Sequence, residues 1–558
     1  MTTTTTTTAQ TSIELLSLST PPTPWHSQTP DNQPSDPPSP FNEHESCPIQ
    51  HPTSSPSPAA VSTRRAISVI ILTSSLLFLT SFTNGLLTIA LPTMAATGSL
   101  SSSLTPQLLV WPTSAYYLTA GSFLLLSGTL ADVIGAKRVN LFGAFFGAVF
   151  AAACGASRTA GEVIAFRALQ GVAYAAATPS GISIISRAVE GMPGRARNMG
   201  FACLGFSQPL GFCVGLVLAG VLVDGVGWRV GFYIVAGCTA AVFAAGVWVL
   251  PGDDDDGDDE QGRSSATRDT LKRIGREVDW VGAGLASFGL ASLSYVLATL
   301  SADINGVRKA PTIVLMIVSA LSVPGFIGWM HRQTKKNRPA LIPNSLWRSG
   351  VFTSSCIMVL VTNAVITCME LYSSLFFQEV QQISAFGASV RIIPSLVSGV
   401  LTNILTGIFV SKMPVLWTVL VASAMSTVAP LLMTLVRTNQ PYWENAFFAQ
   451  ILAPISCDIL FTVGLLIISD VYPKNMQALG GAVFNTCAQL GSAIGLSVIQ
   501  VIASSVTDSS READKSSPQA LKKGYGAAFW FMFGAMVFSC LVCIVGLRRV
   551  GRVGLKRD

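Results

Sequence analysis

Residues 67–93 read ISVIILTSSLLFLTSFTNGLLTIALPT, an apolar run without a charged residue. A helix of about 20 apolar residues crosses the roughly 30 Å of hydrocarbon in a bilayer, so this run predicts a membrane span. Thirteen further apolar runs lie near residues 107–130, 139–156, 162–186, 199–223, 230–250, 279–300, 311–330, 352–377, 386–410, 414–436, 446–470, 478–504 and 524–547. The sequence therefore predicts an all-helical polytopic membrane protein with about fourteen spans.

The composition of the whole chain agrees with this prediction. Of its 558 residues 50% are hydrophobic and 11% are charged, and the mean hydropathy is +0.53. A soluble globular protein carries roughly 25% charged residues. So little charge cannot coat several soluble domains, and a lipid bilayer is the expected surrounding of most of the chain.

The distribution of basic residues predicts the topology. An even number of spans places both termini on one side, and 24 of the 35 Lys and Arg residues then lie on that side, against 10 on the other. Basic residues gather in cytoplasmic loops, so both termini are predicted to be cytoplasmic. The expected location is the plasma membrane, with a vacuolar or vesicular membrane as the alternative.

Stretches between the apolar runs divide the chain. A Ser/Thr/Pro-rich tail (1–62) is predicted to be disordered, and a linker (251–278) begins with the acidic run GDDDDGDDE. A basic loop (331–349) and a basic C-terminus (548–558) follow later. The spans fall into six at 63–250, two at 279–330 and six at 350–547.

Several function classes are excluded by missing residue types. The four histidines all lie outside the apolar runs, and no Gly-Lys pair is present to form a nucleotide-binding Walker A loop. We therefore expect neither an enzyme nor an ATP-driven pump, and no cofactor, metal site or nucleic-acid partner. The expected partners are a small-molecule substrate, protons and the lipid bilayer, and the expected state is a monomer.

The loop after the second run carries a compact motif. It reads GTLADVIGAKR and contains Gly128, Asp132, Gly135, Lys137 and Arg138. Its glycines permit a tight turn, and an acid near a helix end can bond a neighbouring helix terminus and act as a conformational latch. The plainer alternative is an ordinary basic turn.

Two further segments hold unusual residues within the spans. Arg167, in RALQG, places a cation inside a span, which costs about 2.5–3.5 kcal/mol and favours a functional role over simple pairing with a backbone carbonyl. The fifth run has small residues at intervals that let helices approach closely. Its candidate residues are Gln208, Pro209, Gly211, Gly215 and Gly220.

Together with Gly227-Trp228-Arg229, these segments resemble motifs of the major facilitator superfamily, and the chain is similar to its fourteen-span drug:proton antiporter family, especially the fungal branch. The resemblance implies two six-helix bundles with two extra central spans, which rock around a site at the membrane midplane. It implies proton-coupled efflux of a drug or toxic secondary metabolite. The alternatives are transport of a small polar species such as ammonium or borate, and a transporter-like sensor.

The first span departs from this family, which commonly carries an aspartate there. In this sequence Thr83, next to Asn84, occupies the position of that aspartate. A carboxyl group in apolar surroundings can serve as a proton carrier, so Asp458 is the first candidate for proton coupling and Glu370 the second, with Arg167 as a further transport candidate. The alternative is that Asp458 belongs to a structural network. Other polar residues in the spans could line a cavity or bond helices together: Asn84, Gln170, Asn363, Asn485 and Gln489.

Overall fold

The computed structural model describes residues 63–96, 104, 108–189, 194–251, 278–302, 308–336, 338, 340–410, 412–548 and 550–551, which all belong to one unit of the chain. The predicted tail, nearly all of the 251–278 linker and residues 552–558 lie outside this part. The described residues form helices, turns and loops and contain no strand. The all-helical fold class is thereby confirmed.

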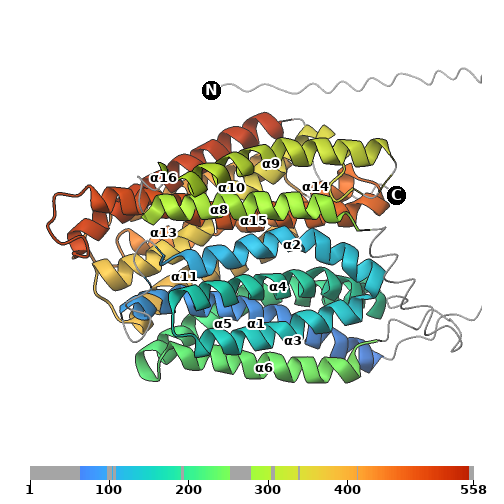
Figure 1. Ribbon diagram of the computed structural model, residues 1–558, viewed down its shortest axis with the longest axis horizontal. Helices are drawn as coiled ribbons and strands as arrows, with labels where there is room; N and C mark the ends of the chain where they lie inside the picture. Colours follow the sequence, from blue (N-terminus) through green and yellow to red (C-terminus); the bar gives the residue numbers. More distant parts are fainter. Residues whose placement is uncertain are drawn as a thin grey trace, which may run out of the picture. The chain divides into compact units, whose positions relative to one another are not determined.

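The described helices follow the predicted apolar runs (Figure 1). They are α1 (Thr63–Ala96), α2 (Trp111–Ile134), α3 (Ala136–Ala156), α4 (Ala160–Ala188), α5 (Gly194–Gly225), α6 (Trp228–Val249), α8 (Trp280–Ala302), α9 (Ala310–Lys335), η4 (Asn344–Arg348), α10 (Gly350–Leu375), η5 (Phe376–Val380), α11 (Ala385–Phe409), α12 (Val415–Leu435), α13 (Ala446–Leu452), α14 (Ile455–Val471), α15 (Lys474–Asp508) and α16 (Pro518–Gly546).

Thirteen described segments are long and apolar enough to cross a bilayer. The remaining long helix, α4, has 29 residues but carries Arg167 and several other polar side chains. The predicted run at 446–470 is divided into α13 and α14, because Pro454 lacks the backbone N–H that a continuous helix needs. Asp458 lies in the first turn of α14 and near the middle of the segment Ala446–Val471, which is long enough to span the membrane.

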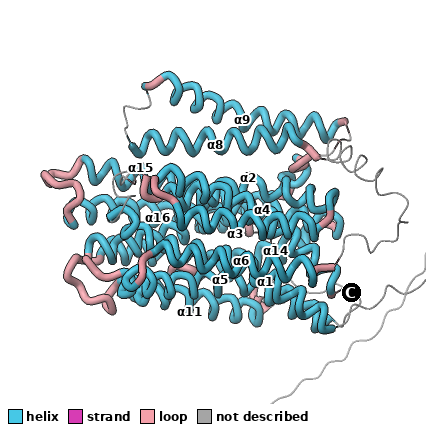
Figure 2. The backbone as a smooth tube through the Cα atoms, turned by 60° about the horizontal axis from the view of Figure 1, so that its bottom comes forward, coloured by secondary structure: helices cyan, strands magenta, loops and turns pink. Residues whose placement is uncertain are grey.

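The first six helices, α1–α6, pack mainly on one another and are called the N-terminal half below. Helices α10–α16 do the same and form the C-terminal half. The extra helices α8 and α9 pack side by side along one flank, as Figure 2 shows, and α8 contacts α2 and α15. Each half therefore carries its own set of helix contacts, and the halves meet where α5 packs on α11 and α2 packs on α15.

Successive helices run in opposite directions, so the bundle has two ends. The α1–α2 end is where α1 finishes and α2 starts, and the α2–α3 end is opposite. At the α1–α2 end one apolar core joins both halves and includes Leu91 and Phe232 together with Tyr372 and Phe529. At the α2–α3 end the described buried residues form several smaller clusters. Four of these lie within the N-terminal half. The cluster of the C-terminal half includes Leu125 and Leu126 of α2. In this conformation the halves are thus joined most firmly at the α1–α2 end.

Candidate functional site

Arg167, on α4, is a fully buried cation within the N-terminal half. Its Nε donates to the backbone oxygen of Pro112 at 3.3 Å, its Nη1 to Gln170 Oε1 at 2.8 Å, and its Nη2 to Asn84 Oδ1 at 2.5 Å. Its guanidinium carbon lies 4.4 Å from the centre of the Tyr116 ring. All of these partners are neutral, so within the described residues hydrogen bonds and a ring face hold the charge without a carboxylate.

It is Asn84, and not Thr83, that faces this arginine. The hydroxyl of Thr83 donates to the backbone oxygen of Leu79 at 2.9 Å and so stays on its own helix, α1. Adjacent side chains of a helix point about 100° apart around its axis. Asn84, the residue after Thr83, therefore points toward α4. An amide can accept a hydrogen bond but cannot carry a proton, so the partner of Arg167 on α1 is not a proton carrier.

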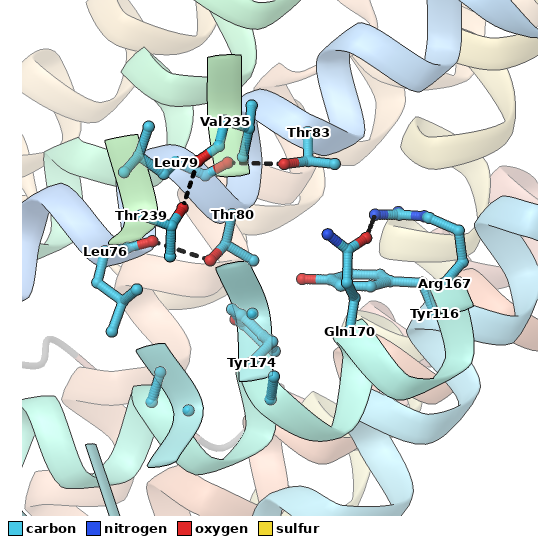
Figure 3. Close-up of a pocket in the computed structure, with 14 residues that line it drawn as sticks. Leu76, Leu79, Thr80, Thr83, Tyr116, Arg167, Gln170, Tyr174, Val235 and Thr239 are labelled. Carbon is cyan, nitrogen blue, oxygen red and sulfur yellow. Dashed lines mark hydrogen bonds between the residues drawn. The ribbon is translucent and has the colours of Figure 1, made fainter. Parts of the chain in front are cut away.

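A small space lies beside Arg167 among α1, α2, α3, α4 and α6. Its volume is about 20 Å³, which is room for about one water molecule. Figure 3 shows the guanidinium reaching Gln170 beside the Tyr116 ring, while Thr83 points back along α1. The N-terminal half therefore has an organised polar centre whose adjoining space is too small for an organic substrate.

The C-terminal half has a polar centre of opposite charge. Glu370 on α10 and Asp458 on α14 are both partly exposed and lie close enough for their charges to interact. The Asn403 side chain of α11 lies near Asp458, and its Nδ2 donates to the backbone oxygen of Gly399 at 3.1 Å. Gly399, one turn earlier, leaves room for that carboxylate, because a Cβ there would lie 2.8 Å from Asp458 Oδ2. Neither acid pairs with a basic side chain of the described residues.

A side chain of α2 lies near both centres, and side chains of α4 and α15 bond the two halves together. The half-buried Tyr117 of α2 is close enough to Glu370 and Arg167 to interact with the charges of both. Gln489 Nε2, on α15, donates to the hydroxyl of Tyr174 on α4 at 3.2 Å. Tyr117 thus lies within reach of both centres, and the Gln489–Tyr174 hydrogen bond joins the two halves.

The predicted cavity residues take different positions. Asn84 and Gln170 belong to the Arg167 network, and Gln489 bridges the halves. Asn363 Nδ2 donates to a backbone oxygen of its own helix at 3.0 Å. Asn485 is partly exposed on α15, one turn from Gln489 and nearer to the α2–α3 end. A cavity-lining role for Asn363 and Asn485 stays a prediction.

The predicted loop motif is mostly helical: Gly128 and Asp132 lie at the end of α2, Gly135 forms the turn, and Lys137 and Arg138 begin α3. Gly135 has φ +108°, a conformation that favours glycine, and this explains the sharp turn. Lys137 Nζ donates to the backbone oxygen of Leu250 at 2.8 Å, at the end of α6. Asp132 is exposed and interacts with the charge of Arg187. The observed bond to a neighbouring helix terminus is therefore made by Lys137, where the sequence had suggested Asp132.

The predicted antiporter motif lies on α5 and comprises Gln208, Pro209, Gly211, Gly215 and Gly220. A Cβ on Gly215 would lie 2.7 Å from Phe82 Cα of α1, and Gly211 approaches the same helix one turn earlier. A Cβ on Gly220 would lie 2.7 Å from Phe386 Cα of α11. The glycines thus permit close packing first within the N-terminal half and then, at Gly220, between the halves.

Sequence reasoning did not single out two polar residues that the structure brings into contact with other helices. Asn403 is an amide within an apolar run, as Asn363 is, but it was not among the predicted residues. Asp224 lies at the end of α5, where a charged residue is typical of a loop. In the structure it contacts α11. Among the described residues, no group of three or more His, Cys, Asp or Glu side chains is placed to hold a metal ion.

Comparisons with other sequences identify the relatives of the chain. The "MFS-type transporter 1" of Pyricularia oryzae is 39% identical over 96% of this chain and 91% of its own length. The "Low affinity ammonium transporter" of Saccharomyces cerevisiae is 26% identical over 79% of this chain and 83% of its own length. The "Efflux pump terG" of Aspergillus terreus is 26% identical over 87% of both chains.

A solved structure shares the fold. The inward-facing, unoccupied bacterial homologue of the human lysosomal transporter Spinster matches 88% of this chain and 99% of its own, with a TM-score of 0.57 and 13% identity. The sequence profile described as "Major Facilitator Superfamily" matches residues 73–495. The chain therefore belongs to the Major Facilitator Superfamily and is a multi-pass secondary transporter.

Proposed function

We propose that this transporter exports a small organic compound, a drug or a toxic secondary metabolite, across the plasma membrane in exchange for protons. The two halves rock against each other, so that the polar region between the centres opens to one side at a time. On this proposal the chain belongs to the fourteen-span drug:proton antiporters, fungal branch, and relatives named as efflux pumps support it.

The observation that carries the proposal is the pair Glu370 and Asp458, which lie near each other without a basic partner among the described residues. Two ionised carboxylates held together away from bulk water repel each other. Such a pair favours binding a proton or a cationic group in place of one negative charge. Asp458 is the main coupling residue because Gly399 leaves space for its carboxylate and Asn403 lies near it, and Glu370 shares the proton.

A transport assay in liposomes tests this function. Purified protein is reconstituted, a pH gradient is imposed, and ethidium serves as the organic cation probe. We expect ethidium to accumulate against its own gradient on the acidic side and to stop accumulating when a protonophore removes the pH gradient. Ethidium movement that ignores the pH gradient would contradict proton coupling.

The ammonium transporter among the relatives favours a second candidate, transport of a small cation. The same pair of acids suits a small cation as well as an organic one. Methylammonium, used as the probe in the same liposomes, separates the two candidates. Competition of methylammonium with ethidium, or its transport in place of ethidium, would favour the small-cation function.

A further inference from the structure

Asp224 is the single acidic residue of α5, and its carboxylate contacts the other half. Its Oδ1 accepts a hydrogen bond from the backbone N–H of Ala385 at 3.2 Å, and its Oδ2 accepts one from Phe386 at 2.9 Å. Ala385 and Phe386 are the first two residues of α11. One carboxylate of the N-terminal half therefore binds the start of a helix of the C-terminal half with both oxygens.

The first N–H groups of a helix have no partner within the helix and carry the positive end of its dipole. At α11, Ser384 Oγ accepts from the third of these groups, Gly387 N, at 3.1 Å. Asp224 supplies the acceptors for the two before it. When the halves part at this end, those two N–H groups lose their charged acceptor.

The surroundings of Asp224 show that this contact belongs to the joined end of the bundle. Gly220, one turn earlier on α5, lies directly against Phe386. At the same end, Ser374 Oγ in the last turn of α10 and Gln378 Nε2 in η5 donate to backbone oxygens of α1 at 2.9 and 3.2 Å. A hollow of about 860 Å³ adjoins this seam, and Asp224 lies on its wall. The carboxylate of Asp224 thus joins the two halves at the edge of the hollow.

We propose that Asp224 is a positioning residue of the transport cycle: it fastens the halves at the α1–α2 end by capping α11, and it must release α11 before that end can open. This inference rests on the alternating-access part of the proposed function. It does not depend on which residue carries protons or on which compound is transported.

The test measures from which end the interior can be reached, with no substrate present. In a background without other cysteines, native Cys368 reports on the α1–α2 end, because it is fully buried in the core that joins the halves. A cysteine introduced by Asn485→Cys reports on the α2–α3 end. A membrane-impermeant maleimide is applied to each side of reconstituted protein, and the labelling rates are compared.

We expect Asp224→Asn to raise labelling of Cys368 from the α1–α2 side about fivefold and to lower labelling at position 485 from the opposite side. General damage to the fold would raise both rates, so the opposite signs identify a shift between conformations. Asp508→Asn is the matched control, since Asp508 also adjoins the hollow but caps none of the described helices of the other half, and it should change neither rate.

A second variant tests the contact from the other side. Ala385→Pro removes one of the two N–H donors, and proline is well accepted at the first position of a helix. Ser384, with ψ 158°, already has the extended conformation that a residue before proline requires. The expected change has the same signs and is smaller. Unchanged labelling in both variants, or an equal change in Asp508→Asn, would overturn the proposal.

Discussion

The two halves of this transporter hold opposite charges in their polar centres. Arg167 in the N-terminal half is surrounded by neutral partners, whereas Glu370 and Asp458 in the C-terminal half share a site without a basic partner among the described residues. Arginine keeps its charge at all relevant pH values. On the proposed function the C-terminal centre therefore exchanges the proton, and the N-terminal centre supplies a constant positive charge.

The largest expected effect concerns the acids. Asp458→Asn should reduce pH-driven ethidium accumulation at least about tenfold, since general acid–base groups contribute factors of this size or more. Glu370→Gln should reduce it less. The double variant should be no worse than Asp458→Asn alone, because two groups that share one proton act as a unit. Losses that multiply in the double variant would show that the acids act separately.

Removal of Arg167 should mainly affect stability. Arg167→Ala deletes three hydrogen bonds from a charged group and leaves Asn84 and Gln170 without their partner, which should lower the stability by about 3 kcal/mol. The midpoint of thermal unfolding in detergent, followed by size-exclusion chromatography, measures this loss. Arg167→Lys should recover only part of it, because an ammonium cannot reproduce the guanidinium fork. Full recovery with lysine would mean that charge alone matters at this site.

Asn84→Asp sharpens the comparison because it gives the N-terminal centre the acid that it lacks. The new carboxylate would accept a charge-assisted bond from Arg167, and we expect a gain of roughly 1 kcal/mol at neutral pH. Thermal unfolding again provides the measurement. The dependence of ethidium accumulation on the pH gradient should stay as in the unmodified protein, with Asn363→Asp as a comparison for an added acid elsewhere.

The smallest effect on transport is expected from removing the hydrogen bond between Gln489 and Tyr174, which joins the two halves. Gln489→Leu removes the single hydrogen bond to Tyr174, and bonds of this kind between membrane helices contribute about 0.6 kcal/mol. A change in transport rate of less than about threefold follows from that energy. A loss as large as that of Asp458→Asn would show that Gln489 takes part in substrate or proton transfer.

Long apolar runs made the helices predictable, since about 20 such residues can lie stably only across a bilayer. The interruption at Pro454 was missed because the apolar run continues on both sides of it. The partner of Arg167 on α1, Asn84, could not be predicted, because only the packing of α1 on α4 decides which side of the helix faces the cation. The Asp224 contact joins residues about 160 positions apart, and no local pattern reveals such a pairing.

The central claim is that protons are coupled through the C-terminal acids and not through the Arg167 centre. Proton movement into liposomes, recorded with an internal pH dye after addition of ethidium, tests it most directly in Asp458→Asn beside Asn84→Asp. We predict that Asp458→Asn abolishes ethidium-dependent proton movement and that Asn84→Asp leaves it unchanged. Proton movement that persists in Asp458→Asn and in its double variant with Glu370→Gln would contradict the account.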